Sequence, residues 1–228
     1  MAEPERRIVE DLPVNLSFDD IAERLLLEEE EDRELMRARC AVAAALARPK
    51  GIYTVRPVAA IEGEQVTIGG SVFRSRVLAG NLQGVQQVCA YVVTCGREVD
   101  DWSRQEPDPI VALWLDMVKE TILRHAMEPF LTQIAHEQGL ERYATMSPGS
   151  GNVDVWPIGQ QHTLFQLIGG VEEAIGVHLT ESCLMLPTKS CSGILYSSET
   201  GFITCTLCSR AHCPSRRAEY DPAAGQWM

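Results

Sequence analysis

The sequence lacks several features that would place it in a familiar class. No apolar run reaches the roughly 18 residues that a membrane-spanning helix needs. The first residues, Met1–Arg7, lead into acidic sequence and not into the apolar core of a signal peptide. No pattern typical of a catalytic triad or a phosphate-binding loop is present. We therefore expect a soluble, cytoplasmic protein with no membrane partner.

Basic residues are also scarce. The chain has 20 Lys and Arg against 32 Asp and Glu, which gives a net charge of −12. A surface of this sign repels phosphate backbones, so we expect no nucleic-acid partner. Part of the excess lies in the run Glu28–Asp32. We interpret this run as a solvated helix face, and attraction of a basic partner surface is the alternative.

The first half of the chain shows clear periodicity. Apolar residues with helical spacing predict an acidic helical segment over about 17–48, capped by Ser17 or Asp19, with the acidic run on an exposed face or at a break. Glycines at Gly63 and Gly69 predict two hairpin turns between strands. A further long helix is expected from Pro109 to Gly139, because an apolar stripe with helical spacing runs between a proline that can open a helix and a glycine that can end it.

The second half alternates strands with turn-rich sequence. Arg142–Val155 is rich in Gly, Pro and Ser, so we predict a loop there. The segments with the composition of strands are Val88–Thr94, Thr180–Leu186, Ser190–Tyr196 and Gly201–Leu207. Strands on both sides of a long central helix predict one α+β domain over residues 1–228, with a largely antiparallel twisted sheet and a Cys-rich C-terminal tail at about 202–218.

Eight cysteines are many for a chain without an export signal. Cytosolic thiols are kept reduced, so disulfides do not explain them. Cys40, Cys89 and Cys95 lie in apolar helical or strand-like sequence and are predicted to be small core residues. The other five lie between positions 183 and 213.

The spacing Cys205-x-x-Cys208-x-x-x-x-Cys213 is typical of a metal site. Zinc or an iron–sulfur cluster would need a fourth ligand. If the strands around positions 191 and 205 form a hairpin, Cys191 shares a face with Cys205 and becomes the fourth ligand. His212 and Cys183 are the other candidates. The alternative is a set of free thiols.

Two further segments carry a resemblance to a known family. The first runs Ser147-Pro-Gly-Ser-Gly and is followed by Asp154-Val-Trp-Pro; the second is Leu179–Gly193, which contains Leu-Thr-Glu-Ser and Ser-Cys-Ser-Gly. In this order they resemble the activation domain of cobalamin-dependent methionine synthase and its stand-alone relatives. The resemblance implies cofactor-binding residues in the Pro-Gly loop and in the second segment. These are Ser147, Pro148, Gly149, Ser150, Glu181, Lys189 and Ser190.

The resemblance also implies a function. Such domains dock over a corrinoid and help to return inactive Co(II) to the methylated form, using S-adenosylmethionine and an electron donor. The sequence has no recognisable cobalamin-binding segment, so the cobalamin is expected on a partner protein, with a flavodoxin- or ferredoxin-type protein as electron donor. The chain would then be an accessory part of a methionine synthase or corrinoid methyltransferase system. The alternative functions are an iron–sulfur redox protein and a zinc-stabilised binding module with the same fold.

The Pro-Gly loop departs from the family pattern in one respect. The family has Arg-x-x-Pro-Gly-Tyr, whereas this chain has Thr145 and Ser150 at the Arg and Tyr positions. Loss of the Arg removes a charge-assisted contact to the carboxylate of S-adenosylmethionine. The sequence therefore predicts weak binding or none, unless Arg142 replaces the missing cation. Trp156 and Phe202 are predicted to be packing residues.

Overall fold

The computed structural model describes residues 5–151, 155–213 and 216–224. Its centre is an antiparallel sheet with the strand order β4-β3-β2-β5-β9-β6, and β1 pairs with the first half of β2. The strands of this sheet are β1 Arg6–Val9, β2 Lys50–Glu62, β3 Gln65–Ile68, β4 Ser71–Arg74, β5 Gln87–Thr94, β6 Tyr143–Met146 and β9 Ser190–Ser197. The predicted α+β class with a largely antiparallel sheet is confirmed.

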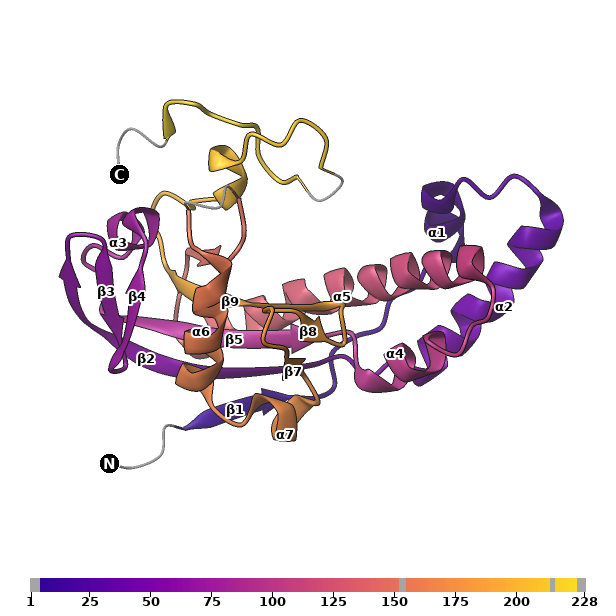
Figure 1. Cartoon of the computed structure of the whole chain (residues 1–228), viewed down its shortest axis with the longest axis horizontal. Coiled ribbons are helices and arrows are strands. Elements are labelled where there is room, and N and C mark those ends of the chain that lie inside the picture. Colours follow the sequence, from indigo (N-terminus) through magenta and orange to yellow (C-terminus); the bar gives the residue numbers. More distant parts are fainter. Residues whose placement is uncertain (1–4, 152–154, 214–215, 225–228) are drawn as a thin grey trace.

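Helices cover both faces of the sheet and also form a separate lobe. They are α1 Phe18–Leu25, α2 Glu30–Leu46, α3 Arg76–Asn81, α4 Arg97–Ser103, α5 Pro109–Glu137, α6 Gln161–Ile168 and α7 Val171–Ile175. The C-terminal half of α5 packs on one face of the sheet, and α6 packs on the opposite face. The N-terminal half of α5 continues beyond the sheet and packs with α1, α2 and α4 in a helical lobe (Figure 1). No helix among the described residues is long and apolar enough to cross a membrane.

The helix ends follow the sequence signals. The Ser17 side chain accepts a hydrogen bond from the Asp20 amide, and Asp108 Oδ1 accepts from the amides of Ile110 and Val111. These caps satisfy amides that have no partner within the helix. Helix α1 ends at Leu25 and α2 begins at Glu30, so the acidic run lies at a break between two helices. The last three residues of the run, Glu30–Asp32, occupy the first turn of α2, where the helix dipole favours negative charge.

The core of the sheet also agrees with the sequence. Strand β5 has seven buried residues in succession because it lies between β2 and β9 and has helices on both faces. Cys40, Cys89 and Cys95 are buried, as expected. Trp156 is fully buried and packs edge-to-face on Phe73, with 5.7 Å between the ring centroids. Phe202 packs against the same cluster, so both aromatic residues are packing residues.

Three predictions about the second half were wrong. The predicted loop over 142–155 contains β6, a short edge strand that pairs with the end of β9. Of the predicted strand Thr180–Leu186, only the end is a strand, β8 (Met185–Leu186), and the residues before it form a tight turn that follows β7 (His178–Leu179). The predicted strand Gly201–Leu207 is a 3-10 helix at Thr204–Leu207, preceded by a single parallel bridge from Ile203 to Thr145. For β6, the distant strand β9, and not the local composition, decides the structure.

Candidate functional site

Strand β9 is paired along only part of one side. It pairs with β5 over Ser190–Leu195, but with β6 only over Ile194–Ser197. Among the described residues, Ser190–Gly193 therefore has a neighbouring strand on the β5 side alone. We call the other side of Ser190–Gly193 the free edge of β9. The Pro-Gly loop, Ser147–Gly151, directly follows β6 and so begins at this edge. The structure thus brings together two segments that the sequence singled out.

The contact between loop and strand depends on Gly193. A Cβ atom at this position would lie 2.5 Å from the Met146 carbonyl oxygen, 2.7 Å from Ser147 Oγ and 3.0 Å from the Tyr91 hydroxyl oxygen. No larger residue fits without a shift of the backbone. The loop itself is a closed turn, because the Gly149 amide donates to the Trp156 carbonyl at 2.7 Å and the Ser150 amide donates to the Ser147 carbonyl at 3.1 Å.

The polar groups behind this contact are Tyr91 and Cys191. Tyr91 is fully buried, and among the described residues its hydroxyl has no hydrogen-bond partner in good geometry, although Ser147 lies close by. Burial raises the pKa of Tyr91. Burial also raises the pKa of the half-buried Cys191 thiol, while the Ser147 hydroxyl and the Arg217 guanidinium act in the opposite direction.

Lys189 and Ser190 lie where β9 begins, and both have partners inside the protein. Lys189 Nζ forms an ion pair with Asp116 of α5, at 2.7 Å from its Oδ2 atom. Ser190 Oγ lies 2.7 Å from the Pro187 carbonyl oxygen and 2.9 Å from Thr94 Oγ1. These contacts fix the start of the free edge against α5 and β5.

Glu181 lies on the turn between β7 and β8. Thr180 Oγ1 accepts a hydrogen bond from the Leu184 amide at 3.0 Å, and Cys183 has a positive φ of 65°, which together close the turn. The Glu181 side chain is exposed, while its carbonyl contacts His162 Nε2 of α6 at 3.2 Å. Among the described residues, the hydrogen bond of the Glu181 carbonyl is thus with α6 and not with the Pro-Gly loop.

The family profile described as "Vitamin B12 dependent methionine synthase, activation domain" matches residues 117–206, which include the Pro-Gly loop and all of β9. Over these residues the chain is similar to the methionine synthase activation domain. A search of curated proteins gave no match.

A solved structure, that of the MetH reactivation domain bound to AdoHcy, has the same fold as this chain. The TM-score is 0.57 at 16% sequence identity, and the alignment covers 85% of this chain and 78% of that chain. At this identity the structural likeness establishes the fold alone. The tail beyond residue 206 lies outside the profile match.

The C-terminal tail of this chain holds the three spaced cysteines. The Cys208 amide donates to the Cys205 carbonyl at 3.1 Å, which closes a turn. The Arg216 guanidinium then donates to the carbonyls of Cys205, Cys208, Arg210 and Ala218. Within the described ranges, no group of three or more His, Cys, Asp or Glu side chains is placed to hold a metal ion.

Two of the sequence predictions, the hairpin that includes Cys191 and the replacement of the loop arginine by Arg142, do not agree with the structure. The hairpin between strands at 191 and 205 was wrong, because β6 occupies the position next to β9. Cys191 therefore does not face Cys205 across a strand pair. Arg142 does not replace the missing loop arginine either, because it precedes β6 and donates to the Glu199 carbonyl at 3.2 Å. The loop follows the opposite end of that strand.

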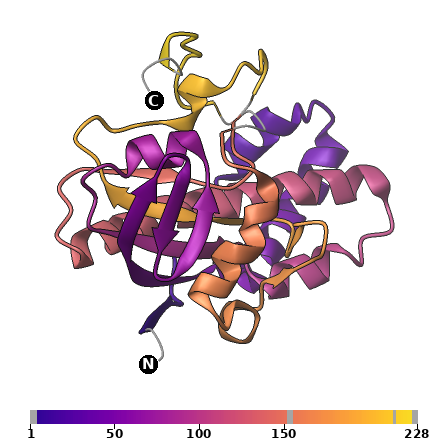
Figure 2. The same ribbon diagram turned by 60° about the vertical axis from the view of Figure 1, so that its left-hand side comes forward.

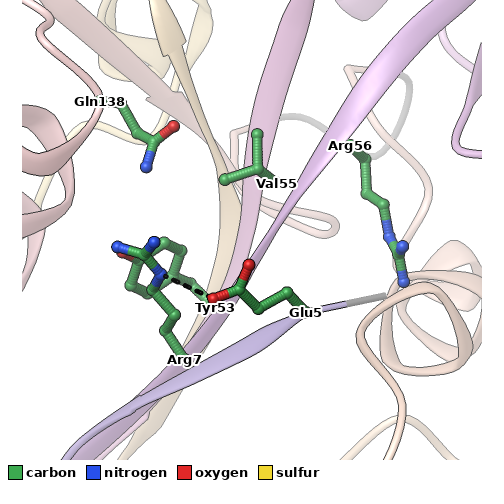
Figure 3. A pocket seen from close by; sticks show the side chains of 6 residues that line it. All are labelled: Glu5, Arg7, Tyr53, Val55, Arg56 and Gln138. Carbon is green, nitrogen blue, oxygen red and sulfur yellow. Dashed lines mark ion pairs between the residues drawn. The ribbon is translucent and has the colours of Figure 1, made fainter. Parts of the chain in front are cut away.

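A separate pocket of about 260 Å³ lies near the N-terminal strand, between β1, β2 and the end of α5 (Figure 3). It is lined by Glu5, Arg7, Tyr53, Val55, Arg56 and Gln138. Beside it, Glu137 accepts hydrogen bonds from Tyr53, Gln133 and Arg7, which lower the pKa of this carboxyl to about 2. Burial raises the pKa of Tyr53 to about 12. Sequence reasoning missed this group because its members are far apart in the chain.

Proposed function

We propose that this chain promotes the reductive reactivation of a methionine synthase or corrinoid methyltransferase, by docking over a cobalamin that the partner carries. The observation that carries the proposal is the free edge of β9 beside the Pro-Gly loop, within the stretch that matches the activation-domain profile. The surface is preformed, since Gly193 lets the loop pack on the strand and Asp116 holds Lys189 in place. A preformed surface binds a partner with little loss of conformational entropy.

We further propose that the Pro-Gly loop takes an adenosyl amino-acid ligand, S-adenosylmethionine or its demethylated product. The support is the solved relative of the same fold, which is bound to AdoHcy. Thr145 and Ser150 replace the arginine and tyrosine of the family pattern, so this loop by itself offers backbone amides and hydroxyls but no cation. Binding through the loop alone would be weak.

The docking proposal has a direct spectroscopic test. The full chain is added to a Co(II) corrinoid protein together with reductant and S-adenosylmethionine. A partner that covers the cobalt face changes its axial ligation, so the visible spectrum should shift and the yield of methylated cofactor should rise. Lys189→Met and Glu181→Gln should weaken the response.

A matched control for these variants is Glu64→Gln, because Glu64 is an exposed carboxylate in the turn between β2 and β3, far along the sheet order from β9. It should behave like the unchanged protein. If no corrinoid protein from the same organism gives a spectral change, the reactivation proposal is wrong.

We propose a second candidate function that one observation favours. It is electron transfer through an iron–sulfur cluster, or stabilisation of a binding module by zinc. Arg216 gathers the carbonyls of the tail into a compact turn that already contains Cys205 and Cys208. We propose Cys205, Cys208 and Cys213 as ligands, with Cys191 as the fourth. The described thiols are not grouped for a metal, so binding would require the tail to close further.

Elemental analysis of anaerobically purified protein tests this candidate. We expect about one zinc ion or one cluster per chain, and Cys208→Ser should release it. Cys183→Ser is the control, because Cys183 lies on the turn between β7 and β8. Metal-free protein with unchanged thermal stability would exclude this function. A flavodoxin- or ferredoxin-type donor would supply the electron for cobalamin reactivation or for an iron–sulfur cluster.

A further inference from the structure

We propose that Cys205 and Cys208 of the C-terminal tail form a redox-active pair. A low-molecular-weight disulfide such as oxidised glutathione oxidises the two thiols to a disulfide, and the corresponding small thiol reduces it again. The inference does not depend on the proposed adenosyl ligand. It uses two thiols of the proposed metal centre, and the disulfide and the metal exclude each other, because a metal binds the free thiolates.

The first step is that the 3-10 helix Thr204–Leu207 brings the two cysteines together. In such a helix the side chains of residues three apart lie one above the other, and a rise of about 2 Å per residue places their Cα atoms about 6 Å apart. A disulfide needs Cα atoms roughly 4.4–6.8 Å apart. The Cys208 amide donates to the Cys205 carbonyl at 3.1 Å, so this spacing extends to the pair.

The second step is that the helix keeps these thiols out of the core. Thr204 and Leu207 are also three apart, and they are only 5% and 7% exposed. Cys205 and Cys208 each follow one of these residues, and both are half-buried free thiols. One side of the helix is therefore buried, and the next side carries both thiols where a small reagent can reach them.

The third step is that the pair lies in an anchored part of the tail. Arg216 donates to the carbonyls of Cys205 and Cys208, at 3.4 Å and 3.1 Å. The Asp221 amide donates to the Thr206 carbonyl at 2.8 Å. The yellow tail lies over one edge of the sheet in both views (Figures 1 and 2). A backbone that is already ordered loses little entropy when the disulfide closes.

The fourth step is that the other cysteines lie elsewhere. Cys191 lies on β9, which pairs with β5 and β6, and Cys183 lies on the turn between β7 and β8. Three cysteines are buried in the core and are closed to a small disulfide: Cys40, Cys89 and Cys95. Cys213 follows the 3-10 helix at a distance of five positions from Cys208, outside the closed turn.

The exchange is balanced in atoms and electrons. One thiolate of the pair attacks the small disulfide, which forms a mixed disulfide and releases one small thiol. The second thiolate then attacks the protein sulfur of the mixed disulfide and releases the other small thiol. The two protein thiols lose two protons and two electrons in total. The small disulfide takes them up and becomes two thiols.

The pair is also placed to act on the Pro-Gly loop. A Cβ atom at Gly151 would lie 3.0 Å from Thr204 Cγ2, so the residue before Cys205 contacts the end of the loop. Ile203, one position earlier, bridges to Thr145 of β6. A disulfide would close the segment of the tail that contacts the loop, so the oxidant level would be sensed next to the candidate site.

Peptide mapping of the metal-free full chain tests the inference. The protein is treated with chelator and reductant, equilibrated at several ratios of oxidised to reduced glutathione, quenched with acid and alkylated in denaturant. The tryptic peptide 190–210 holds Cys191, Cys205 and Cys208. In the oxidised protein this peptide should lack two hydrogens and be alkylated at Cys191 alone. Cys208→Ser should abolish the change, and Cys213→Ser should leave it intact.

Arg216→Met tests whether the folded tail holds the pair together. It removes the bonds to both cysteine carbonyls, so the equilibrium constant for oxidation by glutathione should fall roughly two- to tenfold, the range for the net loss of one hydrogen bond. Arg210→Met is the matched control, because the Arg210 side chain is exposed on the same tail. It should leave the constant unchanged. Equal melting temperatures should show that both variants are folded.

Three results would overturn the inference. They are full alkylation of the peptide at every glutathione ratio, a disulfide that joins either cysteine to Cys191 or Cys213, and an equilibrium constant that Arg216→Met leaves unchanged. None of them bears on cobalamin reactivation, which the spectrum of the corrinoid partner tests separately.

Discussion

The two halves of helix α5 each hold a network of charged side chains, and the networks differ in their exposure to water. In the helical lobe, Lys119 Nζ lies 2.7 Å from Asp100 Oδ1, with the two side chains only 7% and 4% exposed. At the other end, Glu137 pairs with Arg7 at 2.7 Å, but these side chains are 26% and 48% exposed. Nearly equal distances thus occur in very different surroundings.

The buried network is also the longer one. Asp100 accepts a second contact from Arg104 at 2.8 Å, and Asp116 lies 3.6 Å from Lys119 and 2.7 Å from Lys189. Charges of alternating sign therefore run from α4 through α5 to the start of β9. Two members of the network at Glu137, Arg7 and Tyr53, line the pocket beside β1. The hydrogen bonds of Glu137 among the described residues go to Arg7, Tyr53 and Gln133, and none goes to the candidate site.

The difference between them shows that burial, more than distance, sets what an ion pair contributes. A partner lost from a dry site leaves a charge that water cannot solvate, whereas a partly exposed group recovers its hydration. Substitutions in the buried network should therefore cost more stability than substitutions in the exposed one.

The largest effect is expected for Lys119→Met. It leaves the Asp100 carboxylate buried and short of one partner, which should lower the free energy of unfolding by about 3–5 kcal/mol. Urea denaturation followed by circular dichroism measures this. Adding Asp100→Asn removes the uncompensated charge, so the double variant should recover much of the loss. If Lys119→Met were as stable as the unchanged protein, the ion pair between Lys119 and Asp100 would be accessible to water.

A smaller effect is expected for Asp116→Asn. Asp116 is 40% exposed, so its loss should lower the free energy of unfolding by only about 0.5–1 kcal/mol. It should, however, release Lys189, and the response of a corrinoid partner should change more than stability does. Equal responses of Asp116→Asn and the unchanged protein would show that this ion pair does not position the free edge.

At the other network, Glu137→Gln should give a pH-dependent loss of stability. The pKa of Glu137 is lowered from 4.5 to about 2 in the folded protein, so its charged form stabilises the fold above about pH 4.5. This contribution decreases as the pH falls toward 2. The variant should therefore be less stable at pH 7 and approach the unchanged protein near pH 2. A difference that is constant with pH would contradict the assignment.

The smallest effect is expected for Asp101→Asn. This carboxylate pairs with Arg97 at 3.5 Å on the surface of α4, with side chains 66% and 62% exposed. Exposed pairs four residues apart on a helix contribute only about 0.3–0.5 kcal/mol. The melting temperature should hardly move, and added salt should remove what difference there is. A large change would mean that exposure does not rank these pairs.

The sequence by itself determined much of the local structure in the first half of this protein. The caps at Ser17 and Asp108, the turns after Glu62 and Ile68, the buried strand at Val88 and the three core cysteines all follow from neighbours in the chain. Short-range periodicity and turn chemistry suffice for such features. The family resemblance likewise came from contiguous motifs, and the profile match covers both of them.

Only the tertiary structure decided what lies next to β9. The four residues of β6 have too little pattern to be recognised as a strand, and their pairing is fixed by contact with a segment about 50 positions away. The same holds for Lys189 beside Asp116, and for the tail that folds back onto the Pro-Gly loop. Such contacts depend on which surfaces meet when the core closes. Local sequence therefore does not determine them, although it supplies the residues that make them.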